Sequence, residues 1–256
     1  MGAVHVDLRG LGVFLSIFLR LAVVLFMLPF FNTKQFPARV KAPVVLCLAA
    51  MLYPILRTTV APLPFEPGGL VVVIFGEIIF GMVLAFSILV VLAAVQFAGD
   101  LISFQMGFSF AQSVDPATGG QEPVISRWIQ MITMMLFLSL NGHHVLLRAL
   151  VDSFRNIPIG GFVLDAVHFN KLMALVGQLF VIGIQIAAPV MVLLLMIHLI
   201  LALVGKFAPQ INLMATSFPI TITLGMLSFI LALPIIKEAI GHRLIALFHV
   251  LHTLIE

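Results

Sequence analysis

Apolar residues fill six long runs of this 256-residue chain, and polar or turn-forming residues collect in the stretches between them. A membrane-crossing helix needs about 20 apolar residues, so the runs predict helices of the membrane type. A shorter seventh segment, Ala239–Ile255, interleaves His and Arg with apolar residues and is predicted to be an amphipathic C-terminal helix. The six runs are Gly10–Phe31, Ala42–Leu56, Leu70–Ala98, Trp128–Leu147, Leu172–Val204 and Ile211–Ile236.

The lengths of these runs do not suit simple crossings. Ala42–Leu56 is too short for ~30 Å of hydrocarbon and has a proline near each end. Leu172–Val204 is too long, and it contains Gly177, Gly183 and Pro189, which are expected to interrupt it. The basic residues outside the runs divide five against seven between the two sides, so charge does not choose an orientation. Either the chain is oriented by other means, or some runs do not cross a bilayer.

The stretch Phe104–Pro123 differs from the apolar runs on either side of it. Its first residues alternate between large apolar and small or polar types, a period of two that predicts extended chain. Asp115-Pro116 and Gly119-Gly120 are turn signals. Because non-helical backbone cannot lie bare in lipid, the stretch either packs into a constriction or connects helices at the membrane interface. Its large apolar side chains are those of Phe104, Met106, Phe108 and Phe110.

Composition agrees with a membrane protein, because 62% of the residues are hydrophobic, 9% are charged and the mean hydropathy is +1.24. A soluble domain has roughly a quarter charged residues. The apolar run that begins near Gly10 is too long for the core of a cleavable signal peptide. The single Cys47 excludes a disulfide within the chain and Cys-based metal chemistry. The net charge of +3 is scattered, with no basic cluster that would indicate nucleic acid or capture of anionic lipid.

Two charged residues inside apolar runs, Arg20 and Glu77, are candidate functional residues. Charges at membrane depth are costly and usually face a partner or an aqueous path. If both helices run in the same direction, the two residues differ in depth by about 3 residues, or ~4–5 Å, so an ion pair is feasible. A structural pair or a contact of each charge with a partner chain is the first interpretation, and a proton relay is the second. Other isolated polar residues, which usually bond to neighbouring helices, are Gln96, Gln178, Gln185 and His198.

The chain contains no catalytic motif, since HExxH, GxSxG and the phosphate-binding P-loop are all missing from the sequence. His143 and His144 are adjacent and would point about 100° apart on a helix, so they do not form an i,i+4 ligand pair. Asn141-Gly142 is predicted to end a helix, with the His pair at an interface. We expect no enzyme activity, no metal and no cofactor.

Strings of residues along nearly the whole chain match a known pattern. The most specific are Asp115–Pro123 (DPATGGQEP), Asn141–His144 (NGHH) and the PQxN string that Pro209, Gln210 and Asn212 define. With these strings the chain resembles the FliR/SctT family of type III secretion export-gate subunits. The full DPATGGQEP loop favours the flagellar branch of that family over the injectisome branch. Further matches are Arg20, Pro29-Phe30-Phe31, Gly76-Glu77-Ile78, Phe97-Ala98-Gly99 and Gln105-Met106-Gly107.

The resemblance implies an all-α fold of kinked helical hairpins, arranged like a FliP-plus-FliQ fusion, as a single domain over residues 1–256. It implies a pore-forming subunit of the flagellar protein export gate, in the bacterial inner membrane at the basal body and raised toward the periplasm. The implied partners are FliP-like and FliQ-like subunits, an FlhB-like subunit at the cytoplasmic entrance, membrane lipid and unfolded flagellar proteins as substrates. Phe104–Pro123 would be the plug of the closed pore. The implied assembly contacts are His143, His144, Pro209, Gln210 and Asn212.

Two other functions fit the residues. A proton-coupled secondary transporter would use Arg20, Glu77 and His198, but it also predicts inverted repeats, and none is detected in the sequence. An assembly scaffold without a gating role would use the Phe104–Phe110 alternation for packing alone. A gate subunit that seals and opens a pore is the preferred hypothesis.

Overall fold

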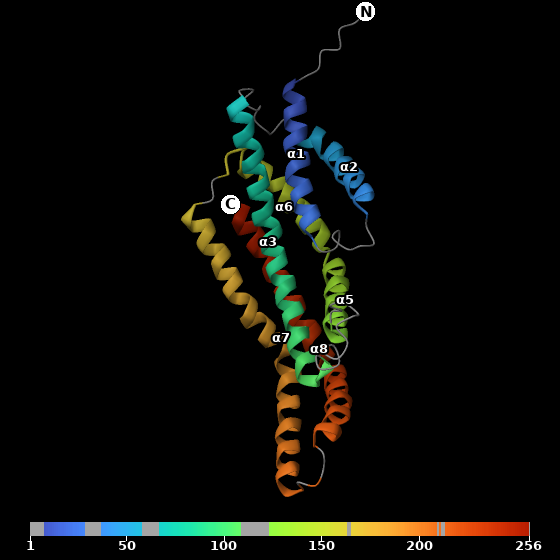
Figure 1. Cartoon of the computed structure of the whole chain (residues 1–256). Helices are drawn as coiled ribbons and strands as arrows, with labels where there is room; N and C mark the ends of the chain where they lie inside the picture. Colours follow the sequence, from blue (N-terminus) through green and yellow to red (C-terminus); the bar gives the residue numbers. More distant parts are fainter. Residues whose placement is uncertain are drawn as a thin grey trace, which may run out of the picture. The chain divides into compact units, whose positions relative to one another are not determined.

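The computed structural model describes residues 8–28, 37–57, 67–108, 123–162, 165–208, 210 and 213–255. Within these ranges every regular element is an α-helix (Figure 1). The predicted all-α, membrane-type fold is confirmed. The helices are α1 (Leu8–Met27), α2 (Ala38–Leu56), α3 (Pro67–Met106), α5 (Val124–Ser139), α6 (Gly142–Asn156), α7 (Ala166–Phe207) and α8 (Leu213–Ile255).

Five of the described helices are long and apolar enough to cross a membrane, namely α1, α2, α3, α7 and α8. Helices α5 and α6 together would add a sixth. Helices α3, α7 and α8 contain 40, 42 and 43 residues. At about 1.5 Å per residue each is ~60–65 Å long, roughly twice the ~30 Å thickness of a bilayer's hydrocarbon core.

The expected interruptions at prolines and glycines are not found. Helix α2 contains both of its prolines and has 19 residues, so the expectation that this run is too short was wrong. Helix α7 continues unbroken through Gly177, Gly183 and Pro189. A proline removes one backbone hydrogen bond, but ending a helix in apolar surroundings would leave several backbone groups without partners, so continuing the helix is favoured.

The C-terminal segment Ala239–Ile255 is helical but is not a separate helix, because α8 runs through it without a break. Lys237 and Glu238 mark the expected boundary, yet both are exposed on the helix surface and do not disturb it. The segment has a buried stripe at spacings of three and four residues. The stripe consists of Ile240, Leu244, Leu247, Leu251 and Leu254.

The chain folds into two compact units, each assembled from segments that lie far apart in the sequence. Unit 1 comprises Met1–Leu89, Gly142–Leu175 and Leu247–Glu256, and unit 2 comprises Val90–Asn141 and Val176–Ala246. Helices α3, α7 and α8 each contribute residues to both units. The single export-gate domain expected from the resemblance stays a prediction.

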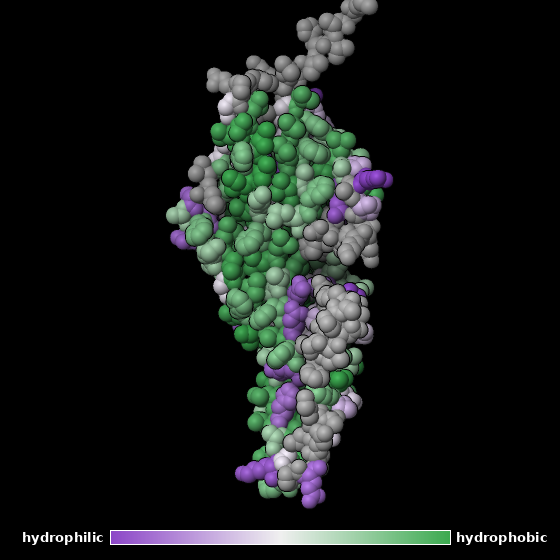
Figure 2. Space-filling model, in the orientation of Figure 1, coloured by the Kyte–Doolittle hydropathy of each residue, from purple (hydrophilic) through white to green (hydrophobic). Residues whose placement is uncertain are grey.

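Unit 1 is built around α1 and the first half of α3, which run in the same direction (Figure 1). Gly81 on α3 lies against α1, where a Cβ atom would be only 2.9 Å from the Val23 Cβ. Such close contact between helices is typical of small residues in membrane proteins. Figure 2 shows hydrophobic side chains over most of the visible face of α1 and α3 in this unit. The outward row on α3 has helical spacing and consists of Val72, Phe75, Ile79, Met82 and Phe86.

Unit 2 is also assembled through glycines at helix contacts. A Cβ on Gly99 of α3 would lie 2.5 Å from the Ser126 Cα of α5, and one on Gly183 of α7 would lie 2.5 Å from the Phe97 ring. A Cβ on Gly225 of α8 would lie 2.8 Å from the Met106 Cγ. Since none of these positions has room for a side chain, the glycines set how closely the four helices pack.

Candidate functional site

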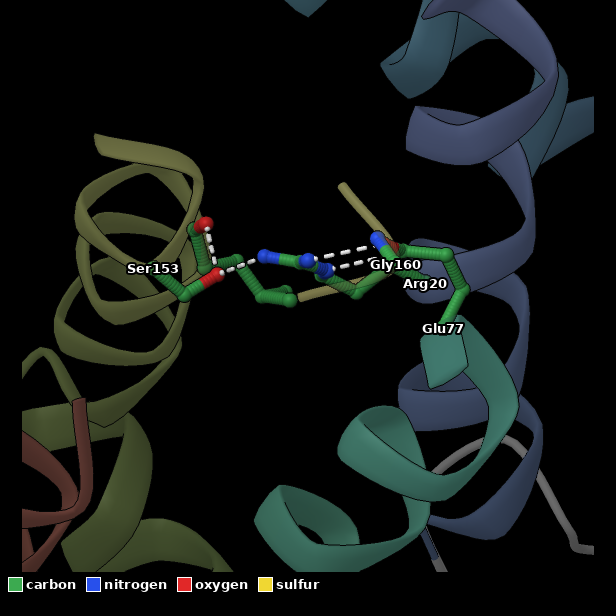
Figure 3. A network of polar contacts seen from close by, with 5 residues as sticks. Arg20, Glu77, Ser153 and Gly160 are labelled. Carbon is green, nitrogen blue, oxygen red and sulfur yellow. Dashed lines mark hydrogen bonds and ion pairs between the residues drawn. The ribbon is translucent and has the colours of Figure 1, made fainter. Parts of the chain in front are cut away.

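Arg20 of α1 and Glu77 of α3 form a two-point ion pair inside unit 1 (Figure 3). The Arg20 Nε donates to Glu77 Oε2 at 2.5 Å and Nη2 donates to Glu77 Oε1 at 2.9 Å. Arg20 is 0% exposed and Glu77 is 1% exposed. The planar guanidinium matches the two carboxylate oxygens, a geometry that a lysine ammonium cannot reproduce.

The third polar partner of Arg20 comes from far along the chain. Ser153 of α6 accepts a hydrogen bond from Arg20 Nη1 at 2.9 Å and donates one to the Leu150 carbonyl at 2.7 Å. In Figure 3 the guanidinium lies between Glu77 and Ser153. The Ser153 hydroxyl can serve both groups because it is a donor and an acceptor. The network therefore joins α1, α3 and α6.

Two aromatic rings and one backbone N–H complete the environment of the pair. The Arg20 Cζ lies 4.5 Å from the Phe80 ring centre and 4.0 Å from the Phe154 ring centre, which are cation–π distances. Gly160, in the segment after α6, donates its N–H to Glu77 Oε1 at 3.2 Å. Together these contacts surround the buried charges with polar and aromatic partners.

Gly160 is the position that brings the segment after α6 onto α3. Its φ is +68°, which a side-chain-bearing residue rarely adopts, and its Cα would lie 3.3 Å from a Cβ placed on Gly76. Phe162 follows and packs edge-on against Phe80 with ring centres 5.0 Å apart. The segment is thus held by its backbone at Gly160 and by its side chain at Phe162.

The chemistry of the Arg20–Glu77 network indicates a structural function. The two charges are paired with each other, and their remaining contacts are with hydroxyl, amide and aromatic groups. Because the two charges are matched to each other by two hydrogen bonds, the geometry suits a fixed joint between helices better than a proton relay. His198, the third residue of the transporter hypothesis, is an exposed residue of α7 in unit 2.

The predicted plug stretch is described only at its two ends. Phe104 and Met106 belong to α3, so the extended chain expected for these residues was wrong. An alternation over so few residues also fits a helix, because Phe104 and Met106 lie on different sides of α3, the first exposed and the second fully buried. Phe110, Asp115, Pro116, Gly119 and Gly120 lie outside the described residues.

Helix α3 ends at Met106, and the next residue, Gly107, has a φ of +87°. Its N–H donates to the Phe104 carbonyl at 3.0 Å, and a Cβ at this position would lie 3.0 Å from the Phe218 ring of α8. A glycine in the left-handed region is a common helix-ending residue. The Thr221 hydroxyl of α8 also lies 3.4 Å from the Met106 carbonyl oxygen, so the end of α3 is fixed against α8.

The predicted assembly residues are only partly described. His143 and His144 are exposed at the start of α6, with ring centres 4.2 Å apart. The break between α5 and α6 falls at the predicted place, where Asn141 has a φ of 55°. Gln210 is exposed in a turn, and Pro209 and Asn212 lie outside the described residues.

The isolated polar residues of the apolar helices behave differently from one another. Gln185 of α7 accepts a hydrogen bond from the Arg243 guanidinium of α8, as expected for a polar residue that links helices. Gln178 and His198 are exposed, and Gln96 is half-buried. In the described part of the chain no group of three or more His, Cys, Asp or Glu residues could hold a metal ion.

Sequence reasoning identified Arg20 and Glu77 but missed the residues that complete the network. Ser153 is 133 positions from Arg20, and no periodicity indicates that α6 returns to this place. The adjacent Phe154 and the Gly160-Gly161 pair were the available signals, since a paired glycine often marks a close approach of backbone.

The fold defines an integral membrane protein of long apolar helices joined by a buried ion pair. The model of the bacterial export proteins, family 1, matches residues 11–246, and the chain belongs to this family. The flagellar biosynthetic protein FliR of Escherichia coli K12 is 33% identical over 93% of this chain and 90% of its own length. The FliR protein of Pectobacterium carotovorum is 32% identical over 91% of this chain and 89% of its own length. The FliR protein of Bacillus subtilis 168 is 30% identical over 87% of this chain and 86% of its own length. The predicted resemblance to FliR is confirmed.

Proposed function

We propose that this chain is a core, pore-forming subunit of the flagellar type III protein export gate. In this function it seals a channel and opens it for unfolded flagellar proteins. The family model and the relatives named for flagellar biosynthesis support the export role and favour the flagellar over the injectisome branch. The proposed location is the bacterial inner membrane at the flagellar basal body.

The observation that carries the proposal is the length of exposed apolar helix. Helix α7 has 42 residues, or ~63 Å, and large apolar side chains are exposed from Val167 near its start to Phe207 at its end. A bilayer covers only ~30 Å of such a surface. The remainder needs other protein chains, which we propose are FliP-like and FliQ-like subunits beside this chain and an FlhB-like subunit at the cytoplasmic entrance.

We further propose that the stretch after α3 is the seal of the closed pore. Met106 and Val124 are separated by 17 residues, although Gly99 and Ser126 bring α3 and α5 into direct contact. Helix–helix connections usually need about 2–8 residues, so this connection is longer than joining the two helices requires. Phe108 and Phe110 would exclude water and ions from the channel, because a hydrophobic constriction blocks ions by dewetting.

Deleting residues 109–120 within the whole complex tests the sealing role. Gly107 and Pro123 are kept, so the ends of α3 and α5 retain their contacts. We expect assembly to persist while the pore leaks, measured as conductance or as uptake of a small membrane-impermeant solute. Phe108→Ala and Phe110→Ala should leak less than the deletion and more than wild type.

A matched control is Phe75→Ala, which removes an exposed phenylalanine from the first half of α3. It should leave the pore as tight as wild type. A deletion complex that assembles and stays tight would show that this connection is not the seal.

A further inference from the structure

Asp100 is the second carboxylate of α3, and its surroundings differ from those of Glu77. Glu77 is paired with a guanidinium, whereas Asp100 accepts a hydrogen bond from the Ser126 hydroxyl of α5 at 2.5 Å. Among the described residues no Lys, Arg or His forms an ion pair with it. A carboxylate inside an apolar segment is costly without a nearby positive charge. Asp100 therefore lacks a cationic partner among the described residues.

The positions next to Asp100 on the same strip of α3 are also polar. Gln96, Asp100 and Ser103 follow at spacings of four and three residues, so they lie on one side of the helix. Ser103 is 0% exposed, and its hydroxyl has no hydrogen-bond partner within the described chain. Buried hydroxyls are normally hydrogen-bonded, so this strip of α3 carries more polar groups than its described neighbours satisfy.

The strip is held rigidly by the contact between α3 and α5. A Cβ on Gly99 would lie only 2.5 Å from the Ser126 Cα, so the two helices cannot approach more closely or exchange positions easily. Ser126 is fully buried and fixes one oxygen of Asp100. Asp100 itself is half-buried, so part of its side chain stays exposed on the surface of the chain.

We propose that Asp100 is the docking point for the ammonium group of a lysine from a neighbouring subunit. An ammonium carries three donors, which suit the acceptors of the half-buried Asp100 and Gln96, and its apolar stem can pass through apolar surroundings. An arginine fork prefers both oxygens of a carboxylate, and Ser126 already engages one of them. The inference rests on the proposed multi-subunit assembly and names the chemistry of one contact in it.

Zero-length cross-linking tests the contact in the intact assembly. The complex is isolated through a tag on this chain and treated with dicyclohexylcarbodiimide, which activates a carboxyl group as an O-acylurea. A lysine amine in contact attacks the carbonyl carbon, the amide bond forms, dicyclohexylurea leaves and the nitrogen loses a proton. We expect an isopeptide bond between Asp100 and a lysine of another subunit, identified by peptide mass spectrometry.

The variant Asp100→Asn should lose this cross-link, and Asp152→Asn, which changes an exposed carboxylate of unit 1, should keep it. If the assembly is isolated but Asp100 is unmodified, carries only an N-acylurea or is linked to a lysine of its own chain, the inference is wrong. The proposed function would stand in that case. If the chain is isolated alone, the proposed function fails and the inference fails with it.

Discussion

The Arg20–Glu77 pair can be tested by replacing its members singly and together. Arg20→Met leaves the Glu77 carboxylate buried with the Gly160 N–H as its remaining described hydrogen-bond partner. Glu77→Met leaves the guanidinium with Ser153 and two aromatic rings. Methionine is chosen at both positions because its flexible side chain fills irregular apolar space.

The magnitudes follow from the burial of the pair. Removing one partner of a buried ion pair costs about 3–5 kcal/mol, because the other charge stays buried without compensation. Replacing both partners by apolar side chains removes that penalty and is often close to neutral. We therefore expect the double variant to be more stable than either single variant, and the two single effects to be far from additive.

The assay is the thermal unfolding midpoint of the detergent-solubilised complex, together with the amount of complex recovered. The matched control is Asp152→Ala, which breaks the exposed pair of Asp152 and Arg155 on α6. The Arg155 Nη1 lies 3.7 Å from Asp152 Oδ1 at the surface, and such pairs contribute only about 0–1 kcal/mol. Additive single effects, or single effects as small as that of the control, would refute the reasoning about a buried joint.

Two further predictions concern local packing and capping. Gly99→Ala should separate α3 from α5 and reduce the yield of folded chain. Gly177→Ala has open space around its Cβ position, so it should be neutral or stabilise the fold by up to ~1 kcal/mol. The unfolding midpoints of both variants check this. The backbone N–H and then the ring of His168 lower the pKa of Asp165 at the start of α7. The Asp165 carboxylate caps the start of α7, and its stabilising contribution is present above pH ~4 and is lost as the pH falls through the lowered pKa. Asp165→Ala should therefore speed amide hydrogen exchange in the first turn of α7 at neutral pH and have no effect in strong acid.

The apolar runs could be predicted from the sequence because burial and lipid exposure both select the same residue types. Arg20 and Glu77 could be predicted for the opposite reason, since charges are rare at such positions. Neither argument says which helices contact one another. Ser153 and Gly160 reach the pair through the fold, so no local pattern places them beside it, although the Gly160-Gly161 pair signals a close approach of backbone.

Prolines, glycines and alternating residues failed to break the helices of this chain for one physical reason. Pro189 lies inside α7, and the alternating residues after Phe104 begin inside α3. In apolar surroundings a helix satisfies its own backbone, so it persists through residues that would end it in water. Asn141 and Gly107 did end helices, because both adopt positive φ.

The most direct test of the central claim is the native mass of the particle purified from the membrane through a tag on this chain. We expect a hetero-oligomer that contains other integral membrane subunits. We also expect little folded chain when those subunits are not co-expressed, because ~60 Å apolar helices need protein partners. A monodisperse, detergent-stable particle of 27.9 kDa, the mass of the chain alone, would contradict it.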